Sequence, residues 1–192
     1  MINTPKKIKI VDGFKVRNTI DLDFGCIEDA LACPYIPADE IWFDKAFINE
    51  KDTLMATFVR KRALMKKYGY EKAKQILRKD MKGINPDKVK IKLLEKRWPL
   101  KIYLVSGRLV REYFDFNFVF GGHYKVYDYV PKYEVWIDNA MLTKERKYVL
   151  IHELYELNLM KKGKSYNDSH DYACAREKEE RRRDGVAEYL KD

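Results

Sequence analysis

The chain has 192 residues, of which 46% are hydrophobic and 14% aromatic, and this composition excludes a generally disordered protein. Its formal net charge of +9 favours contact with polyanions, but such a charge is too common to identify a nucleic-acid-binding protein. No apolar run reaches the ~18 residues of a membrane span, and the first residues lack the apolar stretch of a signal peptide, so we expect no membrane insertion. The three cysteines are odd in number and lack C-x-x-C spacing, which predicts reduced thiols in a cytoplasmic protein.

The sequence repeats with a shift of 94 residues. Lys7–Ile48 aligns without a gap on Lys101–Leu142, and 14 of the 42 aligned pairs are identical, far more than random pairing gives. One fold used twice is the simplest interpretation. We therefore predict an α+β protein built by internal duplication of a unit with a β-hairpin, a further strand and two helices. Arg17 and Arg111 occupy matching places in the two copies, and we expect them to form structural ion pairs.

The first copy is predicted to span residues 7–80. Its Asp12-Gly13 pair is typical of a two-residue turn that joins two strands in a hairpin. The expected elements, in chain order, are strands at Lys7–Val11, Val16–Phe24 and Glu40–Asp44, and then helices at about 51–67 and 70–80.

Residues 81–100 connect the two copies. Asn85-Pro86-Asp87 is a helix-start signal and Trp98-Pro99 is a stop signal. We therefore predict a short basic connecting helix that bridges the halves.

The second copy is predicted to span residues 101–184 and to contain the same elements in the same order. Ser106-Gly107 takes the place of the hairpin turn. The expected strands and helices lie at Lys101–Val105, Val110–Phe120, Glu134–Asp138, and about 144–162 and 167–184. The charged run near the end of the last helix is typical of a solvated surface, and a nucleic-acid contact there has only weak support.

The two predicted helices of the second copy form an αα-hairpin. The first is apolar on almost every side, which is typical of a buried helix. A turn at Gly163–Ser165 follows it, and Asn167 or Asp168 is the expected N-cap of the second helix.

The buried helix carries the pattern H-E-x-x-E. At 3.6 residues per turn, His152, Glu153 and Glu156 share one part of its surface. Burying two carboxylates and an imidazole is costly unless they pair with one another or bind a metal. The hairpin would bring His170 from the second helix to the same place, so that His152, Glu156 and His170 surround one cation. Zinc is the expected metal, and Glu153 is the expected general base for its water.

Two further residues are candidate additional ligands. Glu177 lies two turns after His170 on the same helix face, and His123 follows two glycines that allow close backbone approach. A contact with substrate is an alternative role for His123, and an ordinary loop residue explains it equally well. All three histidines of the chain lie in the second copy, so we expect the first copy to provide scaffold and to lack the site residues.

The order of these residues resembles that of a known group of proteins. H-E-x-x-H on a buried helix is the zincin arrangement, and Glu156 stands here at the position of the second histidine. The longer string H-E-x-x-E-x-x-L-M-x-x-G-x-x-Y-x-x-S-H-x-x-A-x-x-x-E resembles zincin-like metal-dependent proteins of phages, plasmids and archaea. The resemblance covers roughly Val130 to Glu177. It implies metal binding, and it implies that Glu134–Asp138 is an edge strand that binds extended peptide substrate.

Two functions follow from these observations. The first is a zincin-like, metal-dependent hydrolase that cleaves a peptide or protein substrate with a metal-activated water. The alternative is a non-catalytic, metal-stabilised structural or binding protein of viral or plasmid origin, in which a metal or a His–Glu network only holds two helices together. An open coordination position facing a cleft would separate the two. The sequence indicates neither the substrate nor the oligomeric state.

Overall fold

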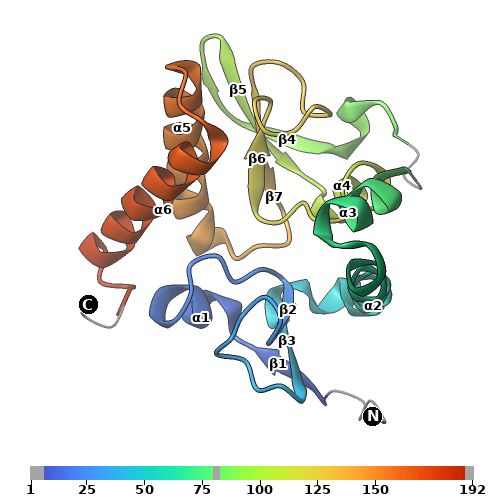
Figure 1. The fold of residues 1–192 in the computed structure, drawn as a ribbon. Helices are drawn as coiled ribbons and strands as arrows, with labels where there is room; N and C mark the ends of the chain where they lie inside the picture. Colours follow the sequence, from blue (N-terminus) through green and yellow to red (C-terminus); the bar gives the residue numbers. More distant parts are fainter. Residues whose placement is uncertain (1–6, 80–82, 189–192) are drawn as a thin grey trace.

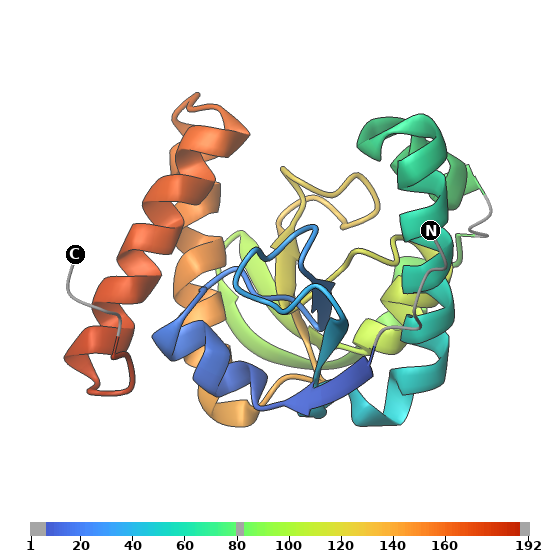
Figure 2. The ribbon, with the colours of Figure 1, turned by 60° about the horizontal axis from the view of Figure 1, so that its bottom comes forward.

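The computed structural model describes residues 7–79 and 83–188, and within them the chain folds into two small sheets and six α-helices (Figure 1). The fold class is therefore α+β, as predicted. The helices α5 and α6 run side by side along one flank of the molecule, and α2 and α3 lie on the opposite flank (Figure 2). Among the described residues, no helix is both long enough and apolar enough to cross a membrane.

The first half of the chain forms a three-stranded sheet with three α-helices. In chain order it contains β1 (Lys7–Val11), α1 (Gly13–Thr19), β2 (Ile27–Asp29), β3 (Glu40–Asp44), the 3₁₀ helix η1 (Lys45–Glu50), α2 (Lys51–Tyr68) and α3 (Tyr70–Lys79). The middle strand is β3, which pairs in parallel with β1 and antiparallel with β2.

The second half forms a four-stranded sheet. In chain order it contains η2 (Pro86–Val89), β4 (Lys90–Arg97), β5 (Leu100–Val105), α4 (Gly107–Tyr113), β6 (Gly121–His123), β7 (Glu134–Asp138), η3 (Thr143–Glu145), α5 (Arg146–Lys161) and α6 (Tyr166–Arg183). The strand order is β4-β5-β7-β6, and β5 and β7 are parallel.

The two sheets use the same pairing at positions shifted by 94. Lys7 lies opposite Glu40 in the first sheet, and Lys101 lies opposite Glu134 in the second. The short antiparallel strands β2 and β6 pair in matching registers as well. The helices expected at about 51–67, 144–162 and 167–184 are present within two residues of the predicted bounds, as are the strands Glu40–Asp44 and Glu134–Asp138. The end of the helix expected at 70–80 lies outside the described residues.

The predicted hairpin turns are wrong. Asp12 is the N-cap of α1 and accepts a hydrogen bond from the backbone N–H of Lys15, and Ser106 caps α4 in the same way. Gly13 is required for packing, because a Cβ there would lie 1.9 Å from Oδ2 of Asp44. The second strand expected in each copy is consequently a short helix followed by a loop, and the flanking strands β1 and β3 become parallel neighbours.

The predicted connecting helix is also wrong. Asn85 caps only the single 3₁₀ turn of η2, and the basic residues that follow form the edge strand β4. The chain returns through Trp98-Pro99 directly into β5, which pairs antiparallel with β4. Residues 80–82 lie outside the described part of the chain. A smaller correction concerns α6, whose N-cap is Ser165 and not Asn167 or Asp168.

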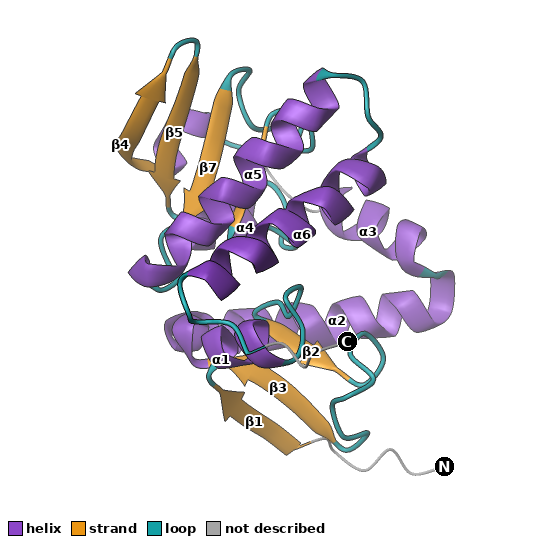
Figure 3. Ribbon diagram, turned by 90° about the vertical axis from the view of Figure 1, so that its left-hand side faces the viewer, coloured by secondary structure: helices purple, strands orange, loops and turns teal. Residues whose placement is uncertain are grey.

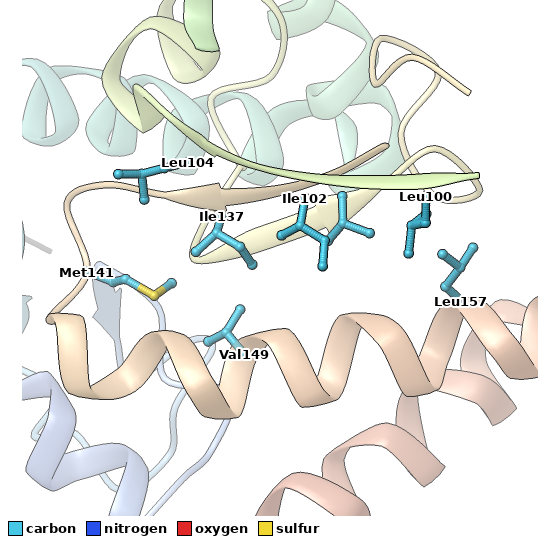
Figure 4. Packing of buried hydrophobic residues seen from close by; sticks show 8 residues of the cluster. Leu100, Ile102, Leu104, Ile137, Met141, Val149 and Leu157 are labelled. Atoms are coloured by element: carbon cyan, nitrogen blue, oxygen red, sulfur yellow. The ribbon is translucent and has the colours of Figure 1, made fainter. Parts of the chain in front are cut away.

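The main core lies between the second sheet and α5 (Figure 4). Leu100, Ile102 and Leu104 alternate along β5 toward the helix, as the two-residue period of a strand requires. Val149 and Leu157 meet them from α5, which lies on one face of the sheet with α6 beside it (Figure 3).

The strand β7 is interior, which contradicts its predicted role as an edge strand for substrate. It lies between β5 and β6, and all five of its residues are buried. Glu134 accepts hydrogen bonds from Lys90 and from the indole of Trp136, while Asp138 pairs with Arg111. These acidic side chains therefore have structural partners.

Two ion pairs, each formed by a buried arginine of one half and a glutamate of the other, join the halves. Arg17 of the first half donates hydrogen bonds from Nε and Nη2 to the carboxylate of Glu145 in the second half. The distance from Nη2 to Oε2 is 2.9 Å. Arg111 of the second half donates from Nη2 to Glu50 of the first at 2.8 Å. Each arginine also binds an aspartate of its own half, as expected for structural ion pairs.

Candidate metal centre

The αα-hairpin of α5 and α6 brings the predicted site residues together. Gly163 has a positive φ of 88°, which ends α5 and reverses the chain. Ser165 then accepts a hydrogen bond from the backbone N–H of Asp168 and starts α6. The polar face of α5 consequently meets His170 on α6.

Three ligand atoms, one from each predicted metal ligand, lie close to one another. His152 Nε2 is 3.2 Å from His170 Nδ1, which in turn is 3.0 Å from Oε2 of Glu156. The third side of the triangle, from His152 Nε2 to Glu156 Oε2, measures 3.6 Å. Zinc bonds nitrogen and oxygen at about 2.0–2.2 Å in tetrahedral geometry, so two such ligands of one ion lie about 3.3 Å apart. The triangle has the size that one zinc ion requires.

Glu177 lies behind His152 and is not a member of this triangle. Its Oε2 is 3.1 Å from Nδ1 of His152, the ring nitrogen that points away from the triangle. Its other oxygen accepts hydrogen bonds from Arg181 at 2.9 and 2.7 Å. A carboxylate that holds the second nitrogen of a ligating histidine is a common feature of metal sites, because it fixes the orientation of the ring.

His123 contacts the second oxygen of Glu156. Its Nε2 is fully buried and lies 3.0 Å from Glu156 Oε1, although the angles do not fit a hydrogen bond. Its Nδ1 accepts a hydrogen bond from the backbone N–H of Lys125 at 3.2 Å. Nδ1 is therefore unprotonated, and Nε2 carries the proton of the neutral ring. A buried N–H without a well-aligned acceptor is the kind of group that a bound water satisfies.

Glu153 faces a cavity beside the triangle. Among the residues that the structure describes, none donates a hydrogen bond to its carboxylate. Burial raises the pKa of Glu153 to about 7, although His152 and His123 partly offset this effect. Gly121 on β6 leaves room for the side chain, since a Cβ there would lie 3.1 Å from Oε1 of Glu153 and 2.9 Å from a methyl group of Val149.

The cavity has a volume of about 280 Å³ and lies at the junction of the two halves. His152, Glu153 and His170 line it from the second half. The loop between α1 and β2 supplies Leu22, Asp23 and Gly25 from the first half. The first half therefore forms part of the wall beside the candidate site.

A line of buried charges leads from the first sheet to the candidate ligands. It runs through Asp44, Arg17, Glu145, Arg181 and Glu177, with alternating sign. Glu145 and Arg181 are both fully buried, and Arg181 Nη2 lies 3.6 Å from Oε1 of Glu145. Every charge in the line contacts at least one charge of opposite sign, which offsets the cost of burial.

The charges of the cluster stabilise one another. Burial lowers the pKa of His152, but hydrogen bonds to Cys174, Glu156 and Glu177 outweigh it and raise the pKa well above the ordinary value. Hydrogen bonds to Cys174 and Glu156 raise the pKa of His170 to about 10. Burial would raise the pKa of Glu156, yet its contacts with the three histidines hold that pKa well below the usual range. A divalent cation could therefore replace the ring protons and still balance the negative charge of the carboxylates.

Sequence reasoning missed three residues of this region. Cys174 lies 3.6 Å from Nε2 of His170, and its spacing of four residues on one helix was a usable signal. Arg181 follows Glu177 at the same spacing. Asp23 belongs to the other half of the chain and approaches only through the tertiary fold.

No family model matches the chain, and no curated protein or solved structure shows significant similarity to it. The resemblance to zincin-like proteins therefore remains a prediction from the residues of the motif.

Proposed function

We propose that the chain is a metal-dependent hydrolase. His152, Glu156 and His170 hold one divalent metal in this proposal, and zinc suits two imidazoles and a carboxylate best. The observation that carries it is the triangle of ligand atoms with sides of 3.0, 3.2 and 3.6 Å at the wall of a cavity. Three protein ligands leave a fourth position for water, as in catalytic zinc sites.

The roles of the side chains follow from their positions. A bound divalent metal supplies Lewis acidity, which makes a water molecule more acidic. Glu153 accepts a proton from that water, and its pKa of about 7 suits a general base near neutral pH. Glu177 fixes the ring of His152, and Arg181 fixes Glu177.

The substrate class in this proposal is a peptide bond. Its support is the resemblance of the α5–α6 string to zincin-like proteins. An extended peptide cannot pair with β7, because both neighbours of that strand are occupied. We therefore place the scissile bond in the cavity between the halves, next to Glu153.

We also propose that the chain arose by internal duplication and that the protein is cytoplasmic. Matching registers in the two sheets and the 42-residue match support an internal duplication in which the two units are related by an approximate two-fold axis. Cys26, Cys33 and Cys174 are all free thiols, which supports a reducing, cytoplasmic setting.

Replacing each carboxylate by its amide tests the two assigned roles. Glu153→Gln should keep the metal and the fold but lose activity by roughly 10²- to 10⁴-fold, because the amide cannot accept the proton. Glu156→Gln should lower metal affinity, and excess metal should restore part of the activity. The measurements are metal content and hydrolysis of a library of unstructured peptides.

The outcomes separate the roles clearly. Loss of metal from Glu153→Gln together with full metal in Glu156→Gln would reverse the two assignments. A metal-loaded wild type that cleaves no peptide in the library would contradict the peptidase proposal.

The alternative function is a non-catalytic metal centre that fastens α5 to α6. One observation favours it: ligand atoms of His152, His170 and Cys174 lie within 4.8 Å of one another. A thiolate that entered the same coordination sphere would close it, and a closed sphere is typical of structural zinc.

A further inference from the structure

Both ring nitrogens of His170 point at clusters of ligand atoms. Nδ1 faces His152 and Glu156, as described above. Nε2 faces Cys174 Sγ at 3.6 Å and Oδ1 of Asp23 at 3.8 Å. Sγ and Oδ1 are themselves 3.6 Å apart, so a second triangle of ligand atoms lies on the opposite side of the same ring.

Two of the three sides of the second triangle have the lengths that a zinc site requires. Zinc–sulfur bonds are about 2.3 Å and zinc–nitrogen bonds about 2.0–2.1 Å, so tetrahedral geometry places sulfur and nitrogen about 3.5 Å apart. The separations of Cys174 from His170 and from Asp23 match this value. Two sides of this triangle, from Cys174 to Asp23 and to His170, also have the lengths of sulfur hydrogen bonds. The third side, 3.8 Å between His170 Nε2 and Asp23 Oδ1, is too long for an N–H···O bond, so hydrogen bonding accounts for only two of the three contacts. A bound ion would draw these two atoms to about 3.3 Å from each other.

The surroundings leave this position accessible. The Asp23 side chain is 67% exposed, and that of His170 is 33% exposed. Leu22, Asp23 and His170 border the cavity between the halves. A cation here would therefore tie the α1–β2 loop of the first half to α6 of the second.

We propose that the centre holds a second divalent cation, bound by Asp23, His170 and Cys174, with the imidazole of His170 bridging the two positions. The inference rests on the proposed function for the first position. One thiolate, one imidazole and one carboxylate suit zinc or cobalt(II) better than magnesium or calcium. Binding requires release of the thiol proton and of the protons on both nitrogens of His170. Both halves of the chain then contribute a ligand to the centre.

Titration of the metal-free, full-length protein with cobalt(II) tests this inference. We expect two equivalents to bind, and a sulfur-to-cobalt charge-transfer band in the near ultraviolet to saturate with one of them. Cys174→Ser should lose the charge-transfer band and should bind one equivalent of cobalt(II) instead of two. Asp23→Asn should weaken binding of the same cobalt ion by more than about 10-fold. The exposed position of this side chain allows the variant to fold.

Cys33→Ser is the matched control. The Cys33 thiol also lies near a carboxylate, 3.8 Å from Asp21, but no histidine joins that pair in the described structure. This variant should bind two equivalents and keep the band. Circular dichroism of each variant checks the fold.

The results distinguish failure of this inference from failure of the proposed function. One equivalent without the band overturns the second position and leaves the hydrolase proposal intact. One equivalent with the band shows that Cys174 joins the first metal, which also overturns the second position. A band that persists in Cys174→Ser overturns it too. No binding at all contradicts both proposals.

Discussion

Glu177 and Arg181 determine how the first candidate ligand is presented. Glu177 accepts from Arg181 with one oxygen and contacts His152 with the other. Burial would raise the pKa of Glu177, but the hydrogen bond to His152 and the charge of Arg181 outweigh it and lower the pKa. The carboxylate is therefore charged in the fold and holds the His152 ring with Nε2 toward the other ligands.

Glu177→Gln should lower metal affinity by about 10- to 100-fold while the protein stays folded, because an outer carboxylate orients the ligating ring. Competition with a chelator measures the affinity. Glu179→Gln is the matched control, since Glu179 lies on the same helix with a side chain that is 67% exposed. Equal affinities for the wild type and Glu177→Gln would show that this carboxylate does not orient a metal ligand.

At the scale of elements, α5 and β6 must approach closely for Glu153 to face the cavity. Gly121 makes this approach feasible, because any larger residue on β6 would displace either Val149 or Glu153. The helix cannot retreat easily, because it packs against β5 and β7 of the same sheet and α6 lies against it as well.

Gly121→Ala should cost about 1–3 kcal/mol of stability through overpacking and should reduce activity by moving Glu153. Thermal unfolding and peptide hydrolysis measure the two effects. Gly83→Ala is the control, because a Cβ there meets only Phe114 at 3.9 Å. Unchanged activity in Gly121→Ala would mean that the position of Glu153 does not depend on this contact.

The helices α2, α3, α5 and α6 and the strands β3 and β7 could be predicted from the sequence because their patterns are local, whereas the sequence predicts strands where α1 and α4 lie. The turn at Asp12-Gly13 could not, because its residues suit both a hairpin and a helix N-cap, and a contact with Asp44 decides between them. The prediction of a helix in place of β4 failed for a similar reason, because pairing with β5 overrides the local helix signals of these residues. For the candidate site, helix spacing indicated His152, Glu156 and His170, whereas the approach of Asp23 depends on how the halves pack.

At the scale of the whole molecule, each half contributes a glutamate to the buried arginine of the other, and Glu145 is fully buried whereas Glu50 is half-buried. Arg17 contacts Glu145, and Arg111 contacts Glu50. Of these two pairs, only Arg17–Glu145 is connected to the candidate metal ligands, because Glu145 also contacts Arg181. The two arginines therefore offer a matched comparison between stability and metal binding.

Arg17→Leu and Arg111→Leu should each destabilise the protein by about 3–5 kcal/mol, because a buried carboxylate loses its partner. Arg17→Leu should also weaken metal binding, whereas Arg111→Leu should leave it nearly unchanged at temperatures where the protein is folded. Chemical denaturation and metal titration measure the two effects. Arg108→Leu, which breaks only an exposed pair with Glu112, should change stability by less than about 1 kcal/mol. Equal metal affinity in Arg17→Leu and the wild type would show that the buried line of charges does not influence the site.

Elemental analysis of the purified full-length chain tests the candidate metal centre most directly. We expect bound divalent metal, chiefly zinc, in the wild type and none in the His152→Ala/His170→Ala double variant, because loss of two of the three ligands removes the site. Metal at the wild-type level in the double variant, or a wild type that stays metal-free after incubation with zinc, would contradict it.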